Sequence, residues 1–518
     1  MTDAPRPPRD PRGLPFFDPK ARPGDPKPPR LGEPKAPRAP RPKARKVGQQ
    51  DMRDIRARLR GTLYERVTPD AGISGDQYSA RQIVDFSLDL GEVMLSSGAD
   101  VRSVEVAIVA VATKWNLAPL ELDISGSAIT IQYAPAEATP LVKVRVIHAE
   151  GANLNRLANV YKIVDGLLFD DLDMTTAVES LVDVLRSPPR WPRWLMDGGL
   201  ALLTVSVSFQ AGGSWQAGVG AFVLMLALQV AGRLLVRRGI PQFFVSGSQG
   251  AAAAAIGTLA IWAGVLSAGG AAAMVAAAVV VLLPHPTLVT WAQDAISGFR
   301  AMALSRALII GLAIGGVVVG VPAGLALTHG LHLEVDPTNI HLTALPLGIS
   351  LLSTIAAAGA NCFVQGASAR IMPIAVGASL LAAVVLYGLR QYGLPLLGAT
   401  FLAAAVLGAV TTVAAARMRT NAAVIAVPAF CGALLPGIPV STALLGFLGG
   451  TPGADLDFVA AVLVALGIGA GLVLGNLVAT PGARRYLRRS KRVQVHSLHT
   501  DTTPLHVMPN LGPGDPRG

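Results

Sequence analysis

The stretch VVVLLPHPTLVTWAQDAISG, Val279–Gly298, decides the fold class of this chain. It begins as an apolar helix, breaks at Pro284-His285-Pro286 and then carries the acidic residue Asp294. Proline has no backbone N–H and clashes with the preceding helical turn. In lipid, backbone groups freed by such a break must be satisfied by protein or by a water-filled cavity. The stretch therefore predicts a membrane helix that is interrupted where it lines a cavity.

The composition of the whole chain agrees with a membrane protein. Of the 518 residues, 51% are hydrophobic and only 15% are charged, against about a quarter in soluble proteins, and the mean hydropathy is +0.48. The net charge of +11 is concentrated at the two ends, so it points to membrane topology and anionic lipid rather than to nucleic acid. The first 60 residues lack the apolar core of a signal peptide, and the two cysteines imply no disulfide framework.

The chain is expected to begin and end in basic tails. Residues 1–66 are rich in proline, lysine and arginine, a composition that cannot bury enough apolar surface to fold. We expect a disordered tail there, with adhesion to anionic lipid as the alternative. Residues 481–518 form the second tail, which opens with a run of arginines.

Residues 79–187 are predicted to form a cytoplasmic α+β domain with the element order ααβββαα. Apolar residues recur at helical spacing over residues 80–95. Gly98 then suits a left-handed helix end and Asp100 the start of the next helix. Three strands are expected at 120–125, 128–133 and 141–148, and helices over 153–169 and 175–186 close the domain.

Ten apolar segments follow, and each is long enough to cross a membrane. Arginines gather in every second connection and in the C-terminal run, whereas the opposite connections hold almost none, with Arg390 as the exception. This asymmetry predicts that both termini are cytoplasmic. The expected spans are 194–212, 215–236, 242–265, 268–290, 303–328, 342–364, 371–389, 393–416, 422–448 and 457–479.

Two sequence anchors suggest that the membrane part is duplicated. Gly239-Ile240-Pro241 is matched by Gly393-Leu394-Pro395, and the break after Leu283 is matched by Leu434-Leu435-Pro436 at nearly the same offset. The predicted units are residues 191–328 and 340–480, with five spans each. A second copy of an odd-numbered unit must insert upside down, and inverted repeats with broken helices are typical of secondary transporters. Coincidence in a chain rich in Ala, Gly and Pro is the alternative.

Three motifs resemble those of the threonine/serine exporter (ThrE) family. They are GEVMLSSGADVRSVE at 91–105, GANLNRL at 151–157, and the Leu283-Pro284 pair with Asp294 and Gly298. The sequence departs from the family at His285, where the family usually has glycine. The resemblance covers about residues 80–480 and implies export of small amino acids or related small organic acids, driven by the proton gradient.

Asp294 is the expected proton-coupling residue. An ionisable group at membrane depth is costly and is a functional hypothesis by default, and a dry site would raise its pKa into a useful range. The alternative is an interfacial helix in which Asp294 pairs with Arg300 or with water.

The broken helices are the expected substrate site, near the membrane midplane between the repeats. Half-helix ends attract the carboxylate and the ammonium of a zwitterion, and His285 titrates near neutrality in water. The alternatives are simple kinks and, for the polar amides that lie in apolar spans, bonds that hold helices together; these amides are Asn361, Asn421, Asn476, Gln249 and Gln365. The candidate residues are Pro284, His285, Pro286, Asn361, Pro436 and Gly437.

The α+β domain supplies a further set of polar candidates. These residues could line a groove, but a turn followed by a helix cap explains the Ser97–Asp100 segment equally well. The candidates are Glu92, Ser97, Asp100, Glu105, Arg145 and Asn153.

The sequence favours a secondary exporter of small amino acids over three alternatives. No HExxH, GxSxG, Walker A or CxxC motif occurs, so no enzyme activity, metal or cofactor is expected. The expected partners are a small amino acid, protons and the lipid bilayer of the plasma membrane, with self-association into a homo-oligomer left open. The alternatives are an exporter of small dicarboxylic acids, a membrane-tethered hydrolase that uses the α+β domain, and a passive channel.

Overall fold

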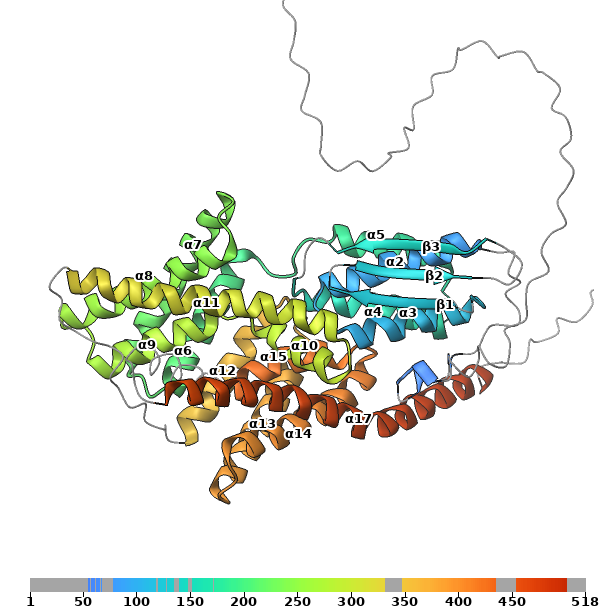
Figure 1. The fold of residues 1–518 in the computed structure, drawn as a ribbon. Helices are drawn as coiled ribbons and strands as arrows, with labels where there is room; N and C mark the ends of the chain where they lie inside the picture. The colour runs from blue at the N-terminus through green and yellow to red at the C-terminus, as the bar shows by residue number, and fades with distance from the viewer. Residues whose placement is uncertain are drawn as a thin grey trace, which may run out of the picture. The chain divides into compact units, whose positions relative to one another are not determined.

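The structure is a computed structural model of the chain, and its described part is mainly helical (Figure 1). The description covers three stretches, 55–330, 347–434 and 453–500. Within the first stretch it omits residues 56, 61, 66, 68–77, 118–119, 127, 135–138, 148–150 and 171. Most of the predicted N-terminal tail therefore lies outside the described residues.

The N-terminal region, residues 78–187, opens with two helices joined by a tight turn. Helix α2 (Ala80–Ser96) begins at a capping box between Ser79 and Gln82, which satisfies two free backbone donors. Helix α3 (Val101–Lys114) begins where the Asp100 carboxylate accepts from the Ser103 N–H. Gly98 links the helices with φ of +95°, a left-handed conformation that glycine adopts without strain.

A three-stranded antiparallel sheet follows, in the spatial order β1-β2-β3. The buried Ile129 and Ile131 of β2 lie on the face that α2 and α3 cover, and α4 and α5 pack behind those helices (Figure 1). Leu59 and Tyr64, from the segment just before the region, are also buried in this core. The bounds are β1 Leu120–Ser125, β2 Ala128–Tyr133, β3 Leu141–Val146, α4 Leu154–Phe169 and α5 Met174–Arg186.

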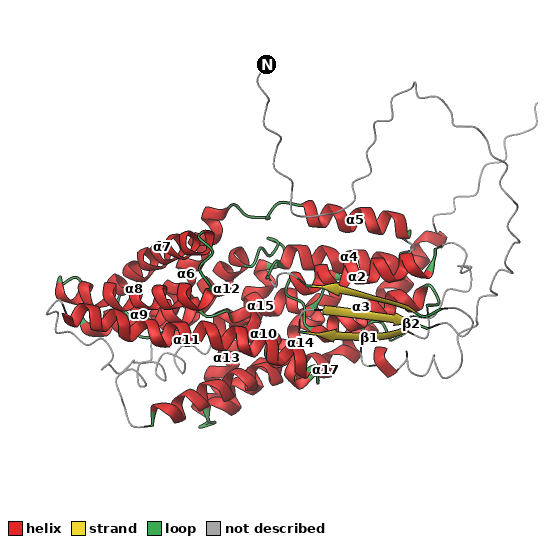
Figure 2. Cartoon of the chain, turned by 45° about the horizontal axis from the view of Figure 1, so that its top comes forward, coloured by secondary structure: helices red, strands yellow, loops and turns green. Residues whose placement is uncertain are grey.

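Among the described residues, eleven further helices follow the N-terminal region (Figure 2). Helices α9 and α10 are separated by a break at Pro284 and meet at a bend of 54°. The bounds are α6 Arg193–Gln210, α7 Trp215–Arg237, α8 Gln242–Trp262, α9 Ala268–Leu282, α10 His285–Ile296, α11 Arg300–Gly330, α12 Leu347–Val364, α13 Met372–Gln391, α14 Leu396–Met418, α15 Ala422–Ala433 and α17 Ala454–Thr500 as the last, beyond a gap in the description.

The chain is a multi-pass membrane protein. Among the described residues, seven helices are long and apolar enough to cross a bilayer, and the bent pair α9–α10 makes an eighth. Two of the ten predicted spans are not in this set. Helix α6 carries the charged Arg193 and Asp197, which lower its mean hydropathy, and α15 has only 12 residues before the description stops at Leu434.

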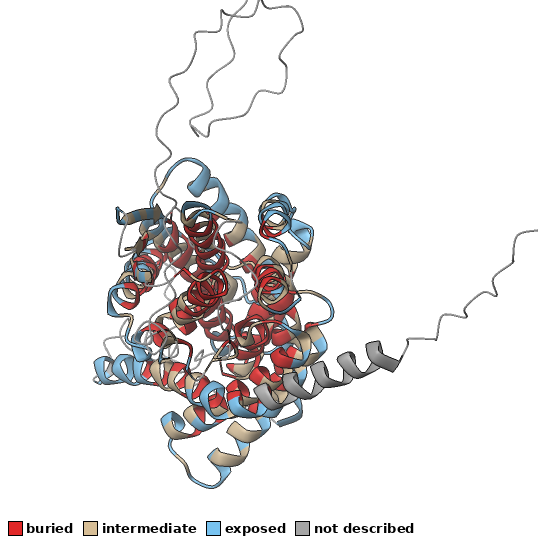
Figure 3. Cartoon of the chain, turned by 90° about the vertical axis from the view of Figure 1, so that its right-hand side faces the viewer, coloured by how far each residue is buried: buried red, intermediate tan, exposed pale blue. Residues whose placement is uncertain are grey.

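Buried residues lie in the interior of the structure and exposed residues lie at its outer faces (Figure 3). Every residue of α9 from Gly270 to Val281 is buried, which matches a helix that is apolar on all sides. Helix α7 instead exposes Val219, Val223 and Val230. Since this helix is long and apolar enough to cross a bilayer, its exposed apolar face is suited to lipid rather than water.

Two helix pairs pack with almost no space between their backbones. A Cβ atom on Gly320 of α11 would overlap the carbonyl oxygen of Gly247 in α8. In the same way, a Cβ atom on Gly475 of α17 would overlap the carbonyl oxygen of Ala405 in α14. Small residues at such contacts let membrane helices approach closely and gain van der Waals packing.

We expect Gly320→Ala to destabilise the protein, because the added methyl group forces α11 away from α8. Overpacking of this kind costs about 1–3 kcal/mol, and thermal unfolding of the purified protein in detergent measures the loss. Gly311→Ala in the same helix is the matched control, since a Cβ atom there meets nothing within 4 Å. Equal unfolding temperatures for the two variants would contradict the close contact.

Candidate functional site

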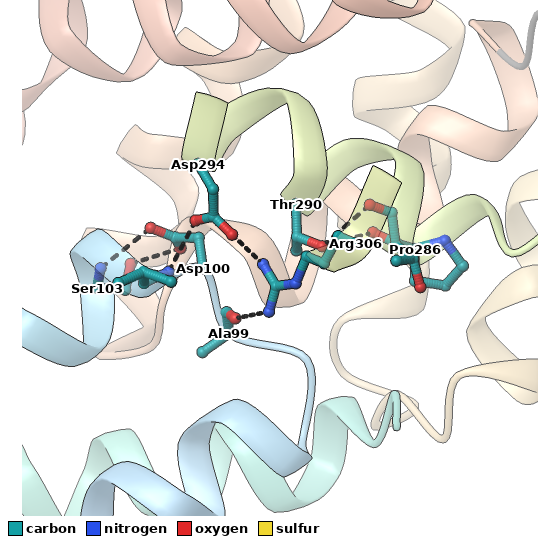
Figure 4. A network of polar contacts seen from close by, with 9 residues as sticks. Ala99, Asp100, Ser103, Pro286, Thr290, Asp294 and Arg306 are labelled. Carbon is teal, nitrogen blue, oxygen red and sulfur yellow. Dashed lines mark hydrogen bonds and ion pairs between the residues drawn. The ribbon is translucent and has the colours of Figure 1, made fainter. Parts of the chain in front are cut away.

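The break at Pro284 sets the direction of α10 and brings its last turn to the N-terminal region. Helix α9 ends at Leu282 and α10 begins at His285, whose N–H donates to the Leu283 carbonyl (2.9 Å). The predicted break is therefore present in the structure. Its consequence is that α10 carries Asp294 to the turn between α2 and α3 (Figure 4).

Asp294 lies in a buried polar network that joins three elements (Figure 4). Its carboxylate pairs with the Arg306 guanidinium of α11 and accepts from the Val101 N–H at the start of α3 (2.9 Å). Arg306 Nη2 also donates to the Ala99 carbonyl (3.2 Å). Asp294 is 0% and Arg306 1% exposed, so both charges are compensated inside the protein, as burial requires.

The network gives Asp294 a clear positioning role. The sequence alternative paired Asp294 with Arg300, whereas the structure pairs it with Arg306. Arg300 and Arg306 are both on α11, but only Arg306 is buried beside the α2–α3 turn. The coupling role of Asp294 stays a prediction, and protonation there would have to compete with the Arg306 cation.

A second set of contacts holds the N-terminal region to α12 and α15. The Leu154 N–H donates to the Gln365 carbonyl just after α12 (2.9 Å). Asn421, which caps α15, donates from Nδ2 to Tyr161 Oη (2.6 Å) and to Ser103 Oγ (3.2 Å). Parts of the 91–105 and 151–157 motifs therefore lie at the contact with the membrane helices.

Tyr161 stays a neutral hydroxyl in this contact. Burial raises the pKa of its phenol above the ordinary value, and the nearby Asp100 carboxylate raises it further. A protonated phenol both donates and accepts hydrogen bonds, which suits its place between Asn421 and Ser103.

A cavity of about 760 Å³ lies between the N-terminal region and the membrane helices α10, α14, α15 and α17. The N-terminal region contributes charged and hydroxyl side chains, and the membrane helices contribute threonines, amides and small residues. The polar residues that line the cavity include Arg60, Asp100, Arg102, Ser103, Tyr161, Asp165, Gln293, Thr411, Thr412, Arg419, Thr420, Asn421, Asn476 and Thr480.

The lining of the cavity extends along α14 for a length that equals about half of the thickness of a bilayer's hydrocarbon core. Its lining runs from Arg419, just after α14, to Gly408 within that helix. Gly408 lies about ten residues before the helix end, and a rise of 1.5 Å per residue makes this about 15 Å. The hydrocarbon core of a bilayer is about 30 Å thick.

Two buried polar atoms on the cavity wall have no hydrogen-bond partner among the described residues. They are Gln293 Oε1 on α10 and Thr420 Oγ1 just before α15. Other polar groups of the wall are bonded within it, such as Thr412 Oγ1 with Asn476 Oδ1 (3.0 Å). Since buried polar atoms are nearly always paired, these two are suited to water or to a ligand.

The four predicted substrate-binding residues that the structure describes are not on this wall. Asn361 is fully buried and donates from Nδ2 to the Val427 carbonyl (3.3 Å), so it links α12 to α15. His285 is buried at the start of α10, and the Pro286 carbonyl accepts from Thr290 (3.2 Å). Pro284 separates α9 from α10. The remaining two, Pro436 and Gly437, lie outside the described residues.

The candidates from the N-terminal region are divided between two places. Arg145 of β3 pairs with Asp89 and, at 3.5 Å, with Glu92, so these residues join the sheet to α2. Glu105 pairs with Arg102 (3.0 Å).

The other three lie at the junction with the membrane helices. Ser97 ends α2 and its carbonyl accepts from the Asn153 N–H (3.1 Å), while Asn153 caps α4. Asp100 alone of the six lines the cavity.

Sequence reasoning missed most of the cavity wall. Thr411, Thr412 and Thr480 bond to carbonyls of their own helices, so in sequence they look like ordinary residues of an apolar span. Tyr161 lies within the helix predicted over 153–169, and no motif marks it. The usable signal was the pair of amides Asn421 and Asn476, which stand out in apolar segments.

Comparisons with known proteins agree with the resemblance in the motifs. A family model described as "Putative threonine/serine exporter" matches residues 85–328. The "Probable threonine/serine exporter" of Mycobacterium tuberculosis (strain ATCC 25618 / H37Rv) is 31% identical over 417 residues, 78% of each chain. The chain belongs to the threonine/serine exporter family. A relative named "Threonine/serine exporter" from Corynebacterium glutamicum is 26% identical over 443 residues, 82% of this chain and 87% of the relative. No solved structure matches this exporter significantly.

In this exporter, Asp294→Ala should be strongly destabilising, because it leaves the Arg306 guanidinium buried without its carboxylate. Breaking a buried pair costs about 3–5 kcal/mol, which thermal unfolding in detergent measures. Asp197→Ala is the control, since it removes the more exposed pair with Arg233 (2.6 Å) and should cost about 1 kcal/mol or less. A loss no larger than that of the control would show that the Asp294 pair does not hold the structure together.

Proposed function

We propose that this protein is a secondary exporter of small amino acids of the threonine/serine class, driven by the proton gradient across the plasma membrane. The cavity between the N-terminal region and the membrane helices is the observation that carries the proposal. Both termini lie in the cytoplasm in this proposal, as the arginine-rich connections indicate. Substrate then enters the cavity from the cytoplasmic side.

The wall of the cavity has the chemistry that a zwitterion needs. Asp100 and Asp165 offer negative charge, Arg60 and Arg102 offer positive charge, and Asn476 is an amide at its inner end. Among the described residues Arg60 has no ion pair. A small amino acid brings both charges, so it can be compensated at several places along this wall.

The cavity supports a substrate site near the membrane midplane. Its inner end at Gly408 is at about half the bilayer depth by the length of α14. The wall combines α10 from the first predicted unit with α14, α15 and α17 from the second. We place the site in this cavity, between the helix end at Thr420 and the inner end at Gly408, with the broken helix at Pro284 as a neighbouring element rather than the wall itself.

The helix contacts support two related units. The pair α8–α11 and the pair α14–α17 occupy corresponding places in the two predicted five-span units, and both pack through glycine against backbone. The bent helix α9–α10 corresponds to α15, after which the description stops at Leu434. In our proposal these units are inverted repeats whose relative movement opens the site to one side of the membrane and then to the other.

Gradient-driven efflux is the direct test. Vesicles that contain the purified protein are loaded with labelled threonine, serine or a small dicarboxylate such as succinate, and efflux is followed with and without a proton gradient. We expect saturable efflux of threonine and serine that the gradient accelerates. Saturation-free, gradient-independent flux would indicate a channel, and a preference for the dicarboxylate would change the substrate class. The relatives are named exporters, so the hydrolase alternative is not proposed.

Asp294→Asn tests the coupling role separately. If Asp294 carries the proton, the variant should exchange labelled for unlabelled threonine but lose the acceleration of net efflux by the gradient. Asp197→Asn is the control, because this acid pairs with Arg233 away from the cavity wall. Coupled efflux at the wild-type rate in Asp294→Asn would end the coupling role and leave Asp294 its place in the buried network.

A further inference from the structure

The start of α15 forms part of the cavity wall. Helix α14 ends at Met418, and Arg419 adopts a left-handed conformation (φ +49°) that turns the chain into α15. Thr420 and Asn421 follow, and both line the cavity together with the first alanines of α15, Ala422 and Ala423. The positive end of the α15 dipole therefore faces the cavity, where it favours a negative group.

Thr420 has an unused hydroxyl at this helix end. The residue is 8% exposed, and its Oγ1 atom is buried without a hydrogen-bond partner among the described residues. Asn421 is already engaged, since its Oδ1 accepts from the Ala423 N–H (2.7 Å) and its Nδ2 donates to Tyr161 and Ser103. The hydroxyl of Thr420 is therefore a donor that remains for a ligand at a positive helix end.

The opposite chemistry is present on α10. Gln293 Oε1 is an acceptor, is buried without a partner among the described residues and lies on the same cavity wall. A ligand that carries both an acceptor and a donor would satisfy this hydroxyl and this amide oxygen together. The carboxylate and the ammonium of an α-amino acid supply the acceptor and the donor, and a dicarboxylate at neutral pH supplies acceptors alone.

We propose that this cavity binds the backbone of an α-amino acid, with the carboxylate at Thr420 and the N-terminal end of α15 and the ammonium at Gln293 Oε1. This assignment rests on the proposed function and names the groups of the protein that bind the substrate. Thr420 and Gln293 then recognise what all α-amino acids share, so they set affinity rather than the choice between side chains.

The test compares threonine with threoninol, which keeps the ammonium and the side-chain hydroxyl but lacks the carboxylate. Full-length protein in inside-out vesicles transports labelled threonine, and threoninol is the competitor. Thr420→Val removes the hydroxyl at nearly constant volume. We expect it to raise the KM for threonine about tenfold, the usual size of a hydrogen bond to a charged group, and to leave the inhibition constant of threoninol unchanged. Gln293→Met should raise both the KM for threonine and the inhibition constant of threoninol.

Two matched variants separate binding from folding. Thr400→Val makes the same change at a buried threonine of α14 that bonds to the Leu396 carbonyl (2.8 Å) and is not on the cavity wall, so its KM should equal that of the wild type. Thr420→Ser keeps the hydroxyl and should restore the wild-type KM.

The outcomes for the two proposals differ. Wild-type vesicles that do not transport threonine would overturn the proposed function. If wild-type vesicles transport threonine, two results would overturn the carboxylate assignment alone. One is an unchanged KM for threonine in Thr420→Val, and the other is an equal loss of affinity for threonine and for threoninol in that variant. Inhibition by threoninol that Gln293→Met leaves unchanged would overturn the ammonium assignment.

Discussion

The buried pair between Asp294 and Arg306 is the constraint on which the arrangement of this exporter depends. Two charges without solvent are tolerated only when each is compensated, and here the α2–α3 turn completes the set through the Val101 N–H and the Ala99 carbonyl. The N-terminal region, α10 and α11 therefore share one polar network. A movement that separates any of them would leave a charge or a backbone group unsatisfied in the interior.

The cavity is a consequence of how the N-terminal region is held. The contacts of Asn421 with Tyr161 and Ser103 bring α15 to the start of α3 and the middle of α4, while α14 and α17 pack closely against each other through Gly475. The space left between them receives polar groups from both parts of the chain. A wall of this mixed origin can present charge at its outer end and threonines and amides at membrane depth.

Much of the fold followed from local sequence patterns. The helix predicted from apolar residues at helical spacing over 80–95 is present as α2, where Ile83, Leu90 and Met94 are among the buried residues, and the break at Pro284 is present. The count of ten spans stays a prediction, because α6 is less apolar than the other spans and only 12 residues of α15 are described. Prolines marked the break in the helix. The cavity wall, however, includes residues at the other end of α10, such as Gln293 and Ile296.

The sequence by itself determined that this is a membrane protein of the exporter family with an interrupted helix and an acid behind the interruption, since hydropathy, proline and motif spacing are local properties. Only the tertiary structure decided that Asp294 meets Arg306 rather than Arg300 and that Thr420 and Gln293 share one cavity. These pairings join residues from different helices, and their geometry depends on how those helices cross. No pattern within one segment records that crossing.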